Sequence, residues 1–446
     1  MSDKLNVCLM NDSFPPLIDG VANCVVNYAN VISNGLGEAT VVTPEHPEAN
    51  DETFPFPVMR YKSMPITEKL CGYRAGYPFS SSRLGRLASS GFDIIHSHCP
   101  FASTLMARVL REKTDAPIIL SYHTKFDVDI RRALPNKMLA ERAISFVVNN
   151  ISACDEVWTV SRGAGENLRS LGYKGDYIVM ENGVDFPCGR AEKTEVEQLR
   201  ALYGLEEDIP VFLFVGRLLW YKGLRLAFDA LKILSDKGID YRMLVVGDGL
   251  DRAEMEEYVG GIGIKDRVIF AGAVTDREDL RVYYTAGDLF VFPSLYDTNG
   301  IVVREAAACG VAALLIEGSC AAEGITHGRT GILTKEDTGA VAAELEFAAS
   351  HLDEVRQIGQ RAMEQIYISW ETAVSRAYER YHAVAENVRA GRTCRSEHVI
   401  SEDFFLAVNA ATNAIQTFRS IPVNIRRSGR RFGNKLLHRG SSDKTE

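Results

Sequence analysis

The chain of 446 residues is too long for one ordinary domain and suits two, each large enough to bury its own hydrophobic core. Hydrophobic residues make up 46% and charged residues 24% of the sequence, which excludes the disordered and fibrous classes of protein. The formal net charge of −9 argues against a nucleic-acid partner, because nucleic-acid-binding proteins neutralise phosphates with an excess of Lys and Arg.

The cysteines and the hydropathy of the sequence indicate the cellular compartment in which the protein works. The nine cysteines are scattered without a C-x-x-C pair, which predicts reduced thiols and a cytoplasmic protein. The N-terminal stretch MSDKLNVCLMNDSFPP indicates a buried strand and its loop rather than a signal peptide, because Asn, Asp and two prolines break its apolar run. No uncharged apolar stretch reaches the roughly 18 residues that a membrane span needs. We therefore expect any contact with a membrane to be made from its surface.

Short β-branched runs alternate with longer helical patterns along the whole chain, as in parallel βαβ units. In the first half, predicted strands cover 6–10, 39–43, 92–97, 116–123, 156–160 and 177–180, and predicted helices cover 21–33, 103–112, 137–153 and 163–171. After a turn-rich break at 181–195, predicted strands cover 210–217, 242–249, 267–274, 288–294 and 310–317, and predicted helices cover 223–237, 251–259, 277–286 and 300–309.

This alternation predicts an α/β fold of two doubly wound, Rossmann-like domains in series, over residues 1–190 and 205–368. Ligands of such domains bind beyond the carboxyl ends of the strands. We therefore expect the two domains to face each other across a ligand-binding cleft.

In the first domain, Gly20 follows the strand at 6–10 and precedes a predicted helix. A helix start offers unpaired N–H groups and the positive end of the helix dipole, and a glycine there lets an anionic ligand approach the backbone closely. The segment is also compatible with an ordinary strand-to-helix turn, because it lacks a G-x-G-x-x-G pattern. Gly20 is therefore a candidate phosphate contact.

In the second domain, the segment VGRLLWYKG places Arg217 directly after a strand and Lys222 at the start of a helix. A diphosphate bound without a metal ion needs such fixed cations, Arg as a planar fork and Lys as a point charge. A strand-end Arg can also be simply solvated. The expected position of this pair opposite Gly20, across the cleft, favours the diphosphate.

Two carboxylates flank a glycine in PSLYDTNGIVVREAAACG, residues 293–310. The core stripe of the helix predicted at 300–309 comprises Val302, Val303, Ala306 and Ala307. Glu305 stands among these apolar residues and needs a polar partner, which two ribose hydroxyls would supply. Asp297, beside a helix start that stabilises anions, would hold a sugar hydroxyl. The alternative is that Arg304 and Glu305 form the solvated edge of an amphipathic helix.

Three histidines lie at or near predicted strand ends of the first domain: His96, His98 and His123. Neutral imidazole can pass a proton or donate a hydrogen bond to a developing charge near neutral pH. His96 and His98 would share one face of a strand, as a metal-binding pair does. Because no third ligand follows at a diagnostic spacing, the sequence predicts no metal site.

These segments together resemble the retaining, nucleotide-sugar-dependent glycosyltransferases of the GT-B fold, and among them family four, which is also called glycosyl transferases group 1. The resemblance spans roughly residues 5–385. It is carried by the order and spacing of the D-G-V loop, HTKF, VSRGAGENLRSLGY, IVMENGVD, VGRLLWYKG, LVVGDGLDRAEME, VIFAGAVTDREDLRVYYTAGDLFVFPS, EAAACG, EGITHGRTGIL and SWETAVSRAYERY.

The resemblance implies a donor site for a nucleoside-diphosphate sugar and assigns residues to it. Gly20 would contact the diphosphate, and Arg217 and Lys222 would neutralise it. Glu305 would bind the ribose. Donor cleavage would need no metal ion or other cofactor, as in most relatives.

For the transferred sugar, the resemblance implies contacts from Asp297, Asn299 and Gly300, and from His123 near the reacting carbon. The family usually has Glu at the first acidic position and a bulkier residue before the glycine, where this chain has Asp297 and Asn299. Asp is shorter by one methylene, so its carboxylate sits roughly 1–1.5 Å further back unless the backbone advances. This difference bears on the choice of sugar and on activity itself.

The resemblance further implies that the first domain takes the acceptor and that a helix at 369–395 closes back onto it. Without an obvious nucleophile, retention implies same-face displacement, in which the leaving diphosphate accepts the proton of the acceptor. UDP-glucose is the leading donor. The alternatives are a catalytically silent nucleotide-sugar-binding or scaffold relative and a sugar-nucleotide epimerase on the same fold.

The C-terminal tail, residues 396–446, combines helically spaced apolar residues with a basic run. From residue 419 to the end it holds eight basic and two acidic residues, a net +6. Such a segment can rest on an anionic bilayer, which predicts a peripheral protein on the inner face of the membrane and a lipid acceptor. A solvated tail or a contact with a partner chain remains the alternative, and a saccharide acceptor, as in polysaccharide assembly, stays open.

Overall fold

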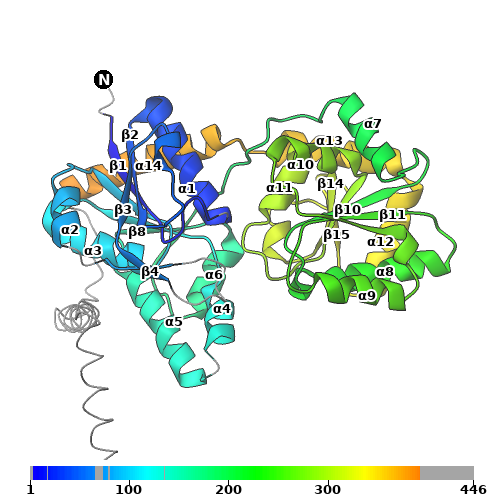
Figure 1. Cartoon of the computed structure of the whole chain (residues 1–446), viewed down its shortest axis with the longest axis horizontal. Helices are drawn as coiled ribbons and strands as arrows, with labels where there is room; N and C mark the ends of the chain where they lie inside the picture. Colours follow the sequence, from blue (N-terminus) through cyan, green and yellow to red (C-terminus); the bar gives the residue numbers. More distant parts are fainter. Residues whose placement is uncertain (1–3, 18, 66–73, 79–80, 135, 392–446) are drawn as a thin grey trace, which may run out of the picture. The chain divides into compact units, whose positions relative to one another are not determined.

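The computed structural model describes the chain except for residues 1–3, 18, 66–73, 79–80, 135 and 392–446. The predicted basic tail therefore lies outside the described residues. Within the described part, two parallel sheets, each covered by helices, form two lobes (Figure 1). The α/β fold class predicted from the alternation of strands and helices is confirmed.

The first lobe is built on a seven-stranded parallel sheet of order β3-β2-β1-β6-β7-β8-β9. Its strands are β1 Asn6–Met10, β2 Glu38–Pro44, β3 Val58–Tyr61, β6 Ile94–Ser97, β7 Ile118–Tyr122, β8 Glu156–Thr159 and β9 Ile178–Val179. A small antiparallel pair, β4 Ser63–Pro65 and β5 Arg74–Gly76, lies beyond β3 in the sequence. The helices are α1 Gly20–Val31, which runs on into a π-helical turn at Ile32–Leu36, α2 Ser81–Ala88, α3 Ala102–Thr114, α4 Phe126–Ala133, α5 Lys137–Ser152 and α6 Arg162–Ser170.

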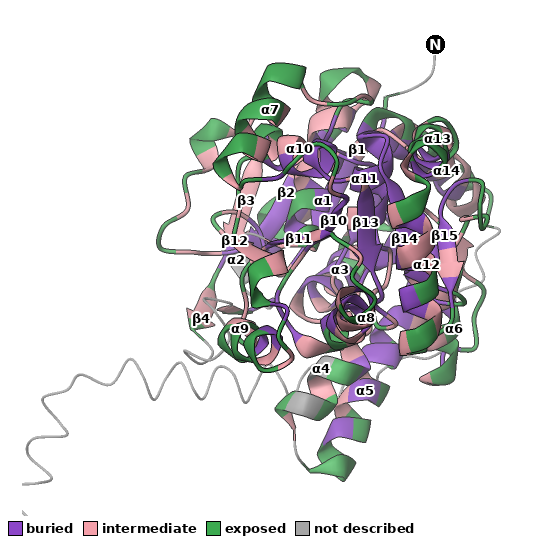
Figure 2. Cartoon of the chain, turned by 90° about the vertical axis from the view of Figure 1, so that its right-hand side faces the viewer, coloured by how far each residue is buried: buried purple, intermediate pink, exposed green. Residues whose placement is uncertain are grey.

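The second lobe has a six-stranded parallel sheet of order β12-β11-β10-β13-β14-β15. Its strands are β10 Val211–Val215, β11 Arg242–Val246, β12 Val268–Gly272, β13 Leu289–Phe292, β14 Ala312–Ile316 and β15 Ile332–Thr334. Its helices are α7 Lys193–Leu202, α8 Leu224–Asp236, α9 Arg252–Gly261, α10 Arg277–Ala286, α11 Ile301–Ala308, α12 Thr338–Ser350 and α13 Leu352–Gln365. The central strands are buried while the outer faces of the helices are exposed (Figure 2).

Each sheet reverses its winding direction beside its first strand. In the first lobe the chain passes from β1 to one side and returns to add β6 on the other, and in the second lobe β10 and β13 meet in the same way. At such a reversal the loops leave toward opposite faces of the sheet and open a crevice at the carboxyl ends of the two strands. The strand ends of β1 and β6, and of β10 and β13, are therefore the places where a ligand is expected.

The last described helix, α14 Trp370–Arg389, packs with the first lobe although it follows the second in sequence (orange in Figure 1). Its Trp370, Tyr378 and Tyr381 join the core cluster that β1 and α1 form. Tyr378 accepts a hydrogen bond from the backbone N–H of Leu5 at 2.7 Å, and the ring of Tyr381 stacks on Trp158. The chain thus crosses twice between the lobes, before β10 and before α14.

The predicted elements lie where the sequence places them, with ends that shift by one to three residues. The helix predicted at 277–286 is α10 in full, and the helix predicted at 300–309 is α11 with one residue fewer at each end. The strands β3, β4, β5 and β15 were not predicted, because each is only three or four residues long and lies at a sheet edge or outside the main sheets. The predicted domain boundaries, 1–190, 205–368 and 369–395, stay predictions.

Candidate functional site

An ion pair joins the segments that follow β10 and β13 in the second lobe. Lys222 Nζ lies 2.7 Å from Asp297 Oδ2, and the two side chains are only 15% and 18% exposed. Gly223 permits this approach: its φ is +84°, and a Cβ at this position would lie 2.1 Å from the carbonyl oxygen of Pro293. Lys222 and Asp297, which follow two neighbouring strands, therefore belong to one site.

Asp297 also organises the loop that leads into α11. Its Oδ1 accepts hydrogen bonds from the backbone N–H groups of Gly300 at 2.9 Å and Asn299 at 3.4 Å. Gly300 has a φ of +60°, and a Cβ on it would lie 2.8 Å from the Cβ of Ala321. Burial alone would raise the pKa of Asp297, but Lys222 and the two backbone donors hold it below its ordinary value. Asp297 is therefore an anion that fixes both the cation and the helix start.

Two other polar side chains predicted for the site, Asn299 and Arg217, keep unused hydrogen-bonding capacity. The amide of Asn299 is shielded from solvent, and neither its Nδ2 nor its Oδ1 has a partner among the described residues. The Arg217 side chain is exposed and forms no ion pair or hydrogen bond within the described part of the chain. A buried amide without partners costs stability, so it marks a position where a ligand can be held.

Glu305 is a buried residue of α11, and its partners come from α10. Its Oε1 accepts from Arg277 Nη2 at 2.6 Å and its Oε2 accepts from Tyr284 Oη at 2.8 Å. The residue is only 4% exposed, and burial raises its pKa, an effect that Arg277 and Tyr284 only partly offset. The sequence correctly required a polar partner for Glu305, but neither Arg277 nor Tyr284 was foreseen.

The alternative in which Arg304 and Glu305 form a solvated helix edge is wrong. Arg304 is 8% exposed, and its Nη2 donates to Glu181 Oε1 at 2.6 Å. Both charged residues are buried because α11 lies between β13, β14 and α13, which leaves it no wide solvent face. Val302, which was expected in the core stripe, is half-buried.

Asp185, in the connection between the lobes, gathers contacts from both. It accepts hydrogen bonds from Asn23 Nδ2 at 2.9 Å, Asn27 Nδ2 at 2.8 Å and Trp370 Nε1 at 2.5 Å. Arg277 Nε lies 3.5 Å from its Oδ2. Because Arg277 also binds Glu305, a continuous polar path runs from α1 of the first lobe to α11 of the second.

At the end of β1, the start of α1 is capped by an acid. Asp19 Oδ1 accepts from the N–H groups of Val21 at 2.8 Å and Ala22 at 2.7 Å. Gly20 itself is exposed, with open space where a Cβ would stand. The helix start predicted to hold a phosphate is therefore accessible, but two of its donors and its positive end are already engaged by a carboxylate. Asp before a helix is a recognisable N-cap signal that the sequence contained.

This cap leads to a prediction for the variant Asp19→Asn. Asn caps a helix as well as Asp does but carries no charge, so the helix should persist while repulsion of an anionic ligand disappears. If the donor diphosphate lies at this helix start, KM for the donor should fall by roughly two- to fivefold. This range corresponds to the strength of the interaction between a charge and a helix end. Steady-state kinetics with varied donor give the answer, and an unchanged or higher KM would place the diphosphate elsewhere.

The three predicted histidines of the first lobe have different neighbours. His96 is held by Tyr381 Oη at 2.6 Å and Ser121 Oγ at 2.8 Å, whereas His98 Nδ1 lies 3.0 Å from His123 Nε2. Burial lowers the pKa of His123 to about 4, against a smaller opposing effect of Asp19. Burial likewise lowers the pKa of His96 and His98 well below the ordinary value. All three imidazoles are therefore neutral at pH 7.

The structure gathers the predicted site residues into separate groups. Lys222, Asp297, Asn299 and Gly300 form one group, Glu305 stands with its own partners, and His123 stands with His98. Gly20 has open space where a Cβ would stand, and the Arg217 side chain makes no hydrogen bond or ion pair with these groups among the described residues. A direct contact between loops of the two lobes is made by Ser161 Oγ, which donates to the carbonyl of Thr298, next to Asp297 and Asn299.

Two doubly wound α/β lobes in series are the architecture of the GT-B fold. A sequence profile described as Glycosyltransferase Family 4 matches residues 18–186, and one described as Glycosyl transferases group 1 matches residues 195–365. The two matched segments together span more than half of the chain. The chain belongs to the family-four glycosyltransferases of the GT-B fold, as its motifs predicted.

Curated relatives are similar over parts of their length. A 2-deoxystreptamine glucosyltransferase from Streptomyces kanamyceticus is 39% identical over 32% of this chain and 37% of its own. The sulfoquinovosyl transferase SQD2 of Arabidopsis thaliana is 26% identical over 66% of this chain and 56% of its own. An alpha-monoglucosyldiacylglycerol synthase from Streptococcus pneumoniae is 22% identical over 69% of this chain and 70% of its own. The chain thus spans about a third to a little over two thirds of these relatives.

Solved structures share the fold at low identity. HepE of Anabaena, in complex with UDP and glucose, superposes with a TM-score of 0.67 at 18% identity, over 85% of this chain and all of that one. A sucrose-phosphate synthase from Thermosynechococcus elongatus gives a TM-score of 0.69 at 20% identity, over 85% of this chain and 99% of that one. At such identities the likeness establishes the fold alone.

Proposed function

We propose that the chain is a retaining hexosyltransferase, which moves glucose from UDP-glucose to a lipid or saccharide acceptor. The observation that carries the proposal is the Lys222–Asp297 pair after β10 and β13. Among the described residues, the Asn299 amide and the Arg217 side chain have no hydrogen-bond partner and remain available to a ligand. HepE, which has the same fold, binds UDP and glucose. Membership of the family supports an enzyme that transfers a sugar from a nucleotide-sugar donor.

Lys222 and Arg217 are suited to a diphosphate. The Lys222 ammonium has three N–H donors, of which Asp297 takes one, so two remain for phosphate oxygens. Arg217 keeps its whole guanidinium fork for a bidentate contact. Charge that develops on the leaving diphosphate would then meet positive groups already in position, which lowers the barrier because little reorganisation is needed.

The remaining residues suit the ribose and the hexose. Each carboxylate oxygen of Glu305 accepts one hydrogen bond from the protein and keeps a lone pair, so the ribose hydroxyls have acceptors. Asn299 and the backbone at Gly300 would hold the hexose. Asp297 is already committed to Lys222 and to the loop, which suits a role in fixing this loop as well as in touching the sugar.

The same-face route to retention assigns the acceptor proton to the leaving diphosphate. The bond from the anomeric carbon to the diphosphate oxygen breaks, the acceptor oxygen bonds to that carbon on the same face, and its proton passes to the departing oxygen. Neutral His123 would donate a hydrogen bond to a hexose hydroxyl near the reacting carbon and would carry no charge of its own.

Of the two acceptor classes, a lipid has specific support. Alpha-monoglucosyldiacylglycerol synthases are among the relatives, and the tip of α4 and α5 exposes apolar side chains: Val128 is 43%, Met138 61% and Leu139 50% exposed. Lys137, Arg142 and the acidic Glu141 border the same surface. Exposed apolar side chains next to cations suit a peripheral contact with anionic lipid. Among the described helices, none is long and apolar enough to cross a bilayer.

Flotation with anionic liposomes tests this contact. We expect the full chain to float, and a chain lacking residues 400–446 to bind at least about tenfold less tightly, because each basic residue near the surface contributes about 1 kcal/mol. The double variant Met138→Ser and Leu139→Ser, with the tail intact, shows whether the tip contributes. Neutral liposomes are the control. Equal flotation of the full and shortened chains would remove the argument for a lipid acceptor that rests on the tail.

A panel of UDP-, GDP- and ADP-sugars tests the function itself. A glucosyltransferase releases UDP from UDP-glucose in the presence of acceptor, and the anomeric signal of the product by NMR reports retention. An epimerase would convert the donor without releasing a free diphosphate. A catalytically silent relative would bind a donor and convert none, and either of these two results would contradict the proposal.

A further inference from the structure

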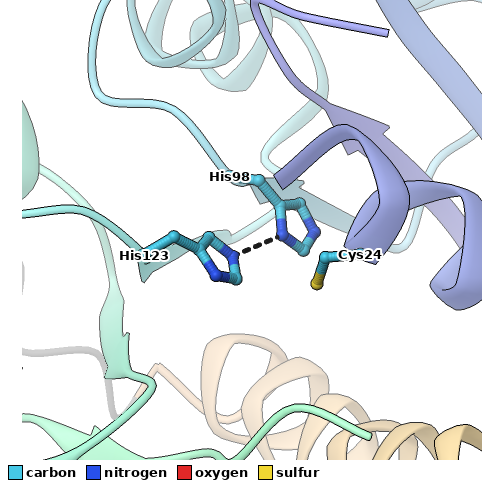
Figure 3. A group of neighbouring side chains, drawn as sticks. All are labelled: Cys24, His98 and His123. Carbon is cyan, nitrogen blue, oxygen red and sulfur yellow. Dashed lines mark hydrogen bonds between the residues drawn. The ribbon is translucent and has the colours of Figure 1, made fainter. Parts of the chain in front are cut away.

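Three buried side chains that can bind metal converge at the switch point of the first lobe. Cys24 comes from α1, His98 follows β6 and His123 follows β7 (Figure 3). One potential ligand atom from each lies within 4.8 Å of the others. Their exposed fractions are 0% for Cys24, 1% for His98 and 8% for His123. The sequence could not reveal the group, because its members are 74 and 25 residues apart.

The spacing of the two imidazole nitrogens is close to that in a metal site. A tetrahedral zinc ion holds sulfur at about 2.3 Å and nitrogen at about 2.0–2.1 Å, which puts two nitrogen ligands roughly 3.3 Å apart. His98 Nδ1 and His123 Nε2 lie 3.0 Å apart, so they need to separate by only a few tenths of an ångström. Thiolate and imidazole are the ligands that zinc prefers.

Hydrogen bonding leaves this group incompletely satisfied. His98 Nε2 is buried and has no partner among the described residues. Cys24 Sγ donates a hydrogen bond to Asn182 Oδ1 at 3.6 Å. His96, in contrast, uses both ring nitrogens on Tyr381 and Ser121 and is not available as a ligand. A bound ion would be a common partner for Cys24 Sγ, His98 Nδ1 and His123 Nε2, while His98 Nε2, the other ring nitrogen, would not be a ligand.

We propose that Cys24, His98 and His123 form a binding site for Zn²⁺, with a fourth position left to water or to an oxygen of a bound ligand. On binding, the thiol of Cys24 releases its proton to solvent, and the ion exchanges its hydration shell for the three side chains and at most one retained water. The hydrogen bond between the imidazoles gives way to two N–Zn bonds, and the ring that donated it moves that proton to its other nitrogen. Since His123 is the residue proposed to contact the hexose, bound zinc inhibits transfer; this consequence rests on the proposed function.

The binding itself is tested with the full chain, reduced and stripped with a chelator, and titrated with Zn²⁺ or Co²⁺. We expect one equivalent bound, and with Co²⁺ a near-ultraviolet thiolate charge-transfer band together with the visible bands of a tetrahedral ion. Cys24→Ala should abolish the charge-transfer band and weaken Zn²⁺ binding by well over about tenfold, since even the loss of an outer partner of a ligand costs 10- to 100-fold. The matched control is Cys154→Ala, another buried thiol of the same lobe.

A second variant guards against a loss of folding. His98→Gln keeps a donor and an acceptor near His123 and loses the imidazole ligand, so it should fold and bind Zn²⁺ weakly. The site is ruled out if the reduced wild type binds no stoichiometric metal, or if Cys24→Ala retains the band and the affinity. The inhibitory consequence is ruled out if zinc saturates the site without slowing transfer. A chain that binds zinc but transfers sugar from no donor would overturn the proposed function and leave the metal site standing.

Discussion

Replacing Lys222 with Ala should lower kcat for sugar transfer by about 100- to 1000-fold, the loss seen when one preorganised group that stabilises developing charge is removed from an enzyme. The same substitution should also lower the free energy of unfolding. Asp297 would lose its 2.7 Å ion-pair partner in a site where it is only 18% exposed. Because its two backbone donors remain, we expect this cost to be about 1–3 kcal/mol, below that of breaking a fully buried pair.

Two matched variants separate rate from stability. In the double variant Lys222→Ala with Asp297→Asn, no unpaired carboxylate remains, so the free energy of unfolding should recover while transfer stays slow. Arg217→Ala removes an exposed side chain without a partner among the described residues, so unfolding should change by less than about 0.5 kcal/mol while transfer falls. Urea unfolding and initial rates measure the two quantities. Wild-type rates in Lys222→Ala would rule out its role at the diphosphate.

Acid should destabilise the first lobe well above the pH at which most carboxylates titrate. His96, His98 and His123 are buried and neutral, with pKa values lowered by burial. An unfolded chain binds protons at these histidines below about pH 6.5, whereas folded His123 does so only near its pKa of about 4. The unfolded state thus binds more protons in this window, so stability falls as the pH drops from about 6.5 to about 4. His123 alone accounts for about 3 kcal/mol across the window.

Urea unfolding at a series of pH values, followed by tryptophan fluorescence, measures this loss. The variant His123→Gln cannot take up a proton, so its free energy of unfolding should fall less steeply with acid than that of the wild type. The exposed His327→Gln is the control and should keep the wild-type slope. Parallel curves for wild type and His123→Gln would show that His123 titrates normally in the folded protein.

Local sequence patterns were sufficient for the two-lobe fold and for most of its elements. Alternating apolar runs and helical periodicity report burial on one or two faces, and this information lies within a dozen neighbouring residues. The same holds for Glu305, whose place among apolar residues required a polar partner, and for Asp19, whose position before a helix is an N-cap signal. Short edge strands such as β15 escaped prediction because three residues carry too little pattern.

By itself, the sequence determined that two doubly wound lobes form and that Gly20, Lys222, Asp297 and His123 lie at the carboxyl ends of strands, because parallel strands in βαβ units all end at one edge. Tertiary structure alone decided the partners: Lys222 with Asp297 at 75 residues' separation, Arg277 with Glu305 at 28, and Cys24 with His98 and His123. Strand order brings these groups together, and strand order depends on the packing of whole sheets, which no local pattern of residues records.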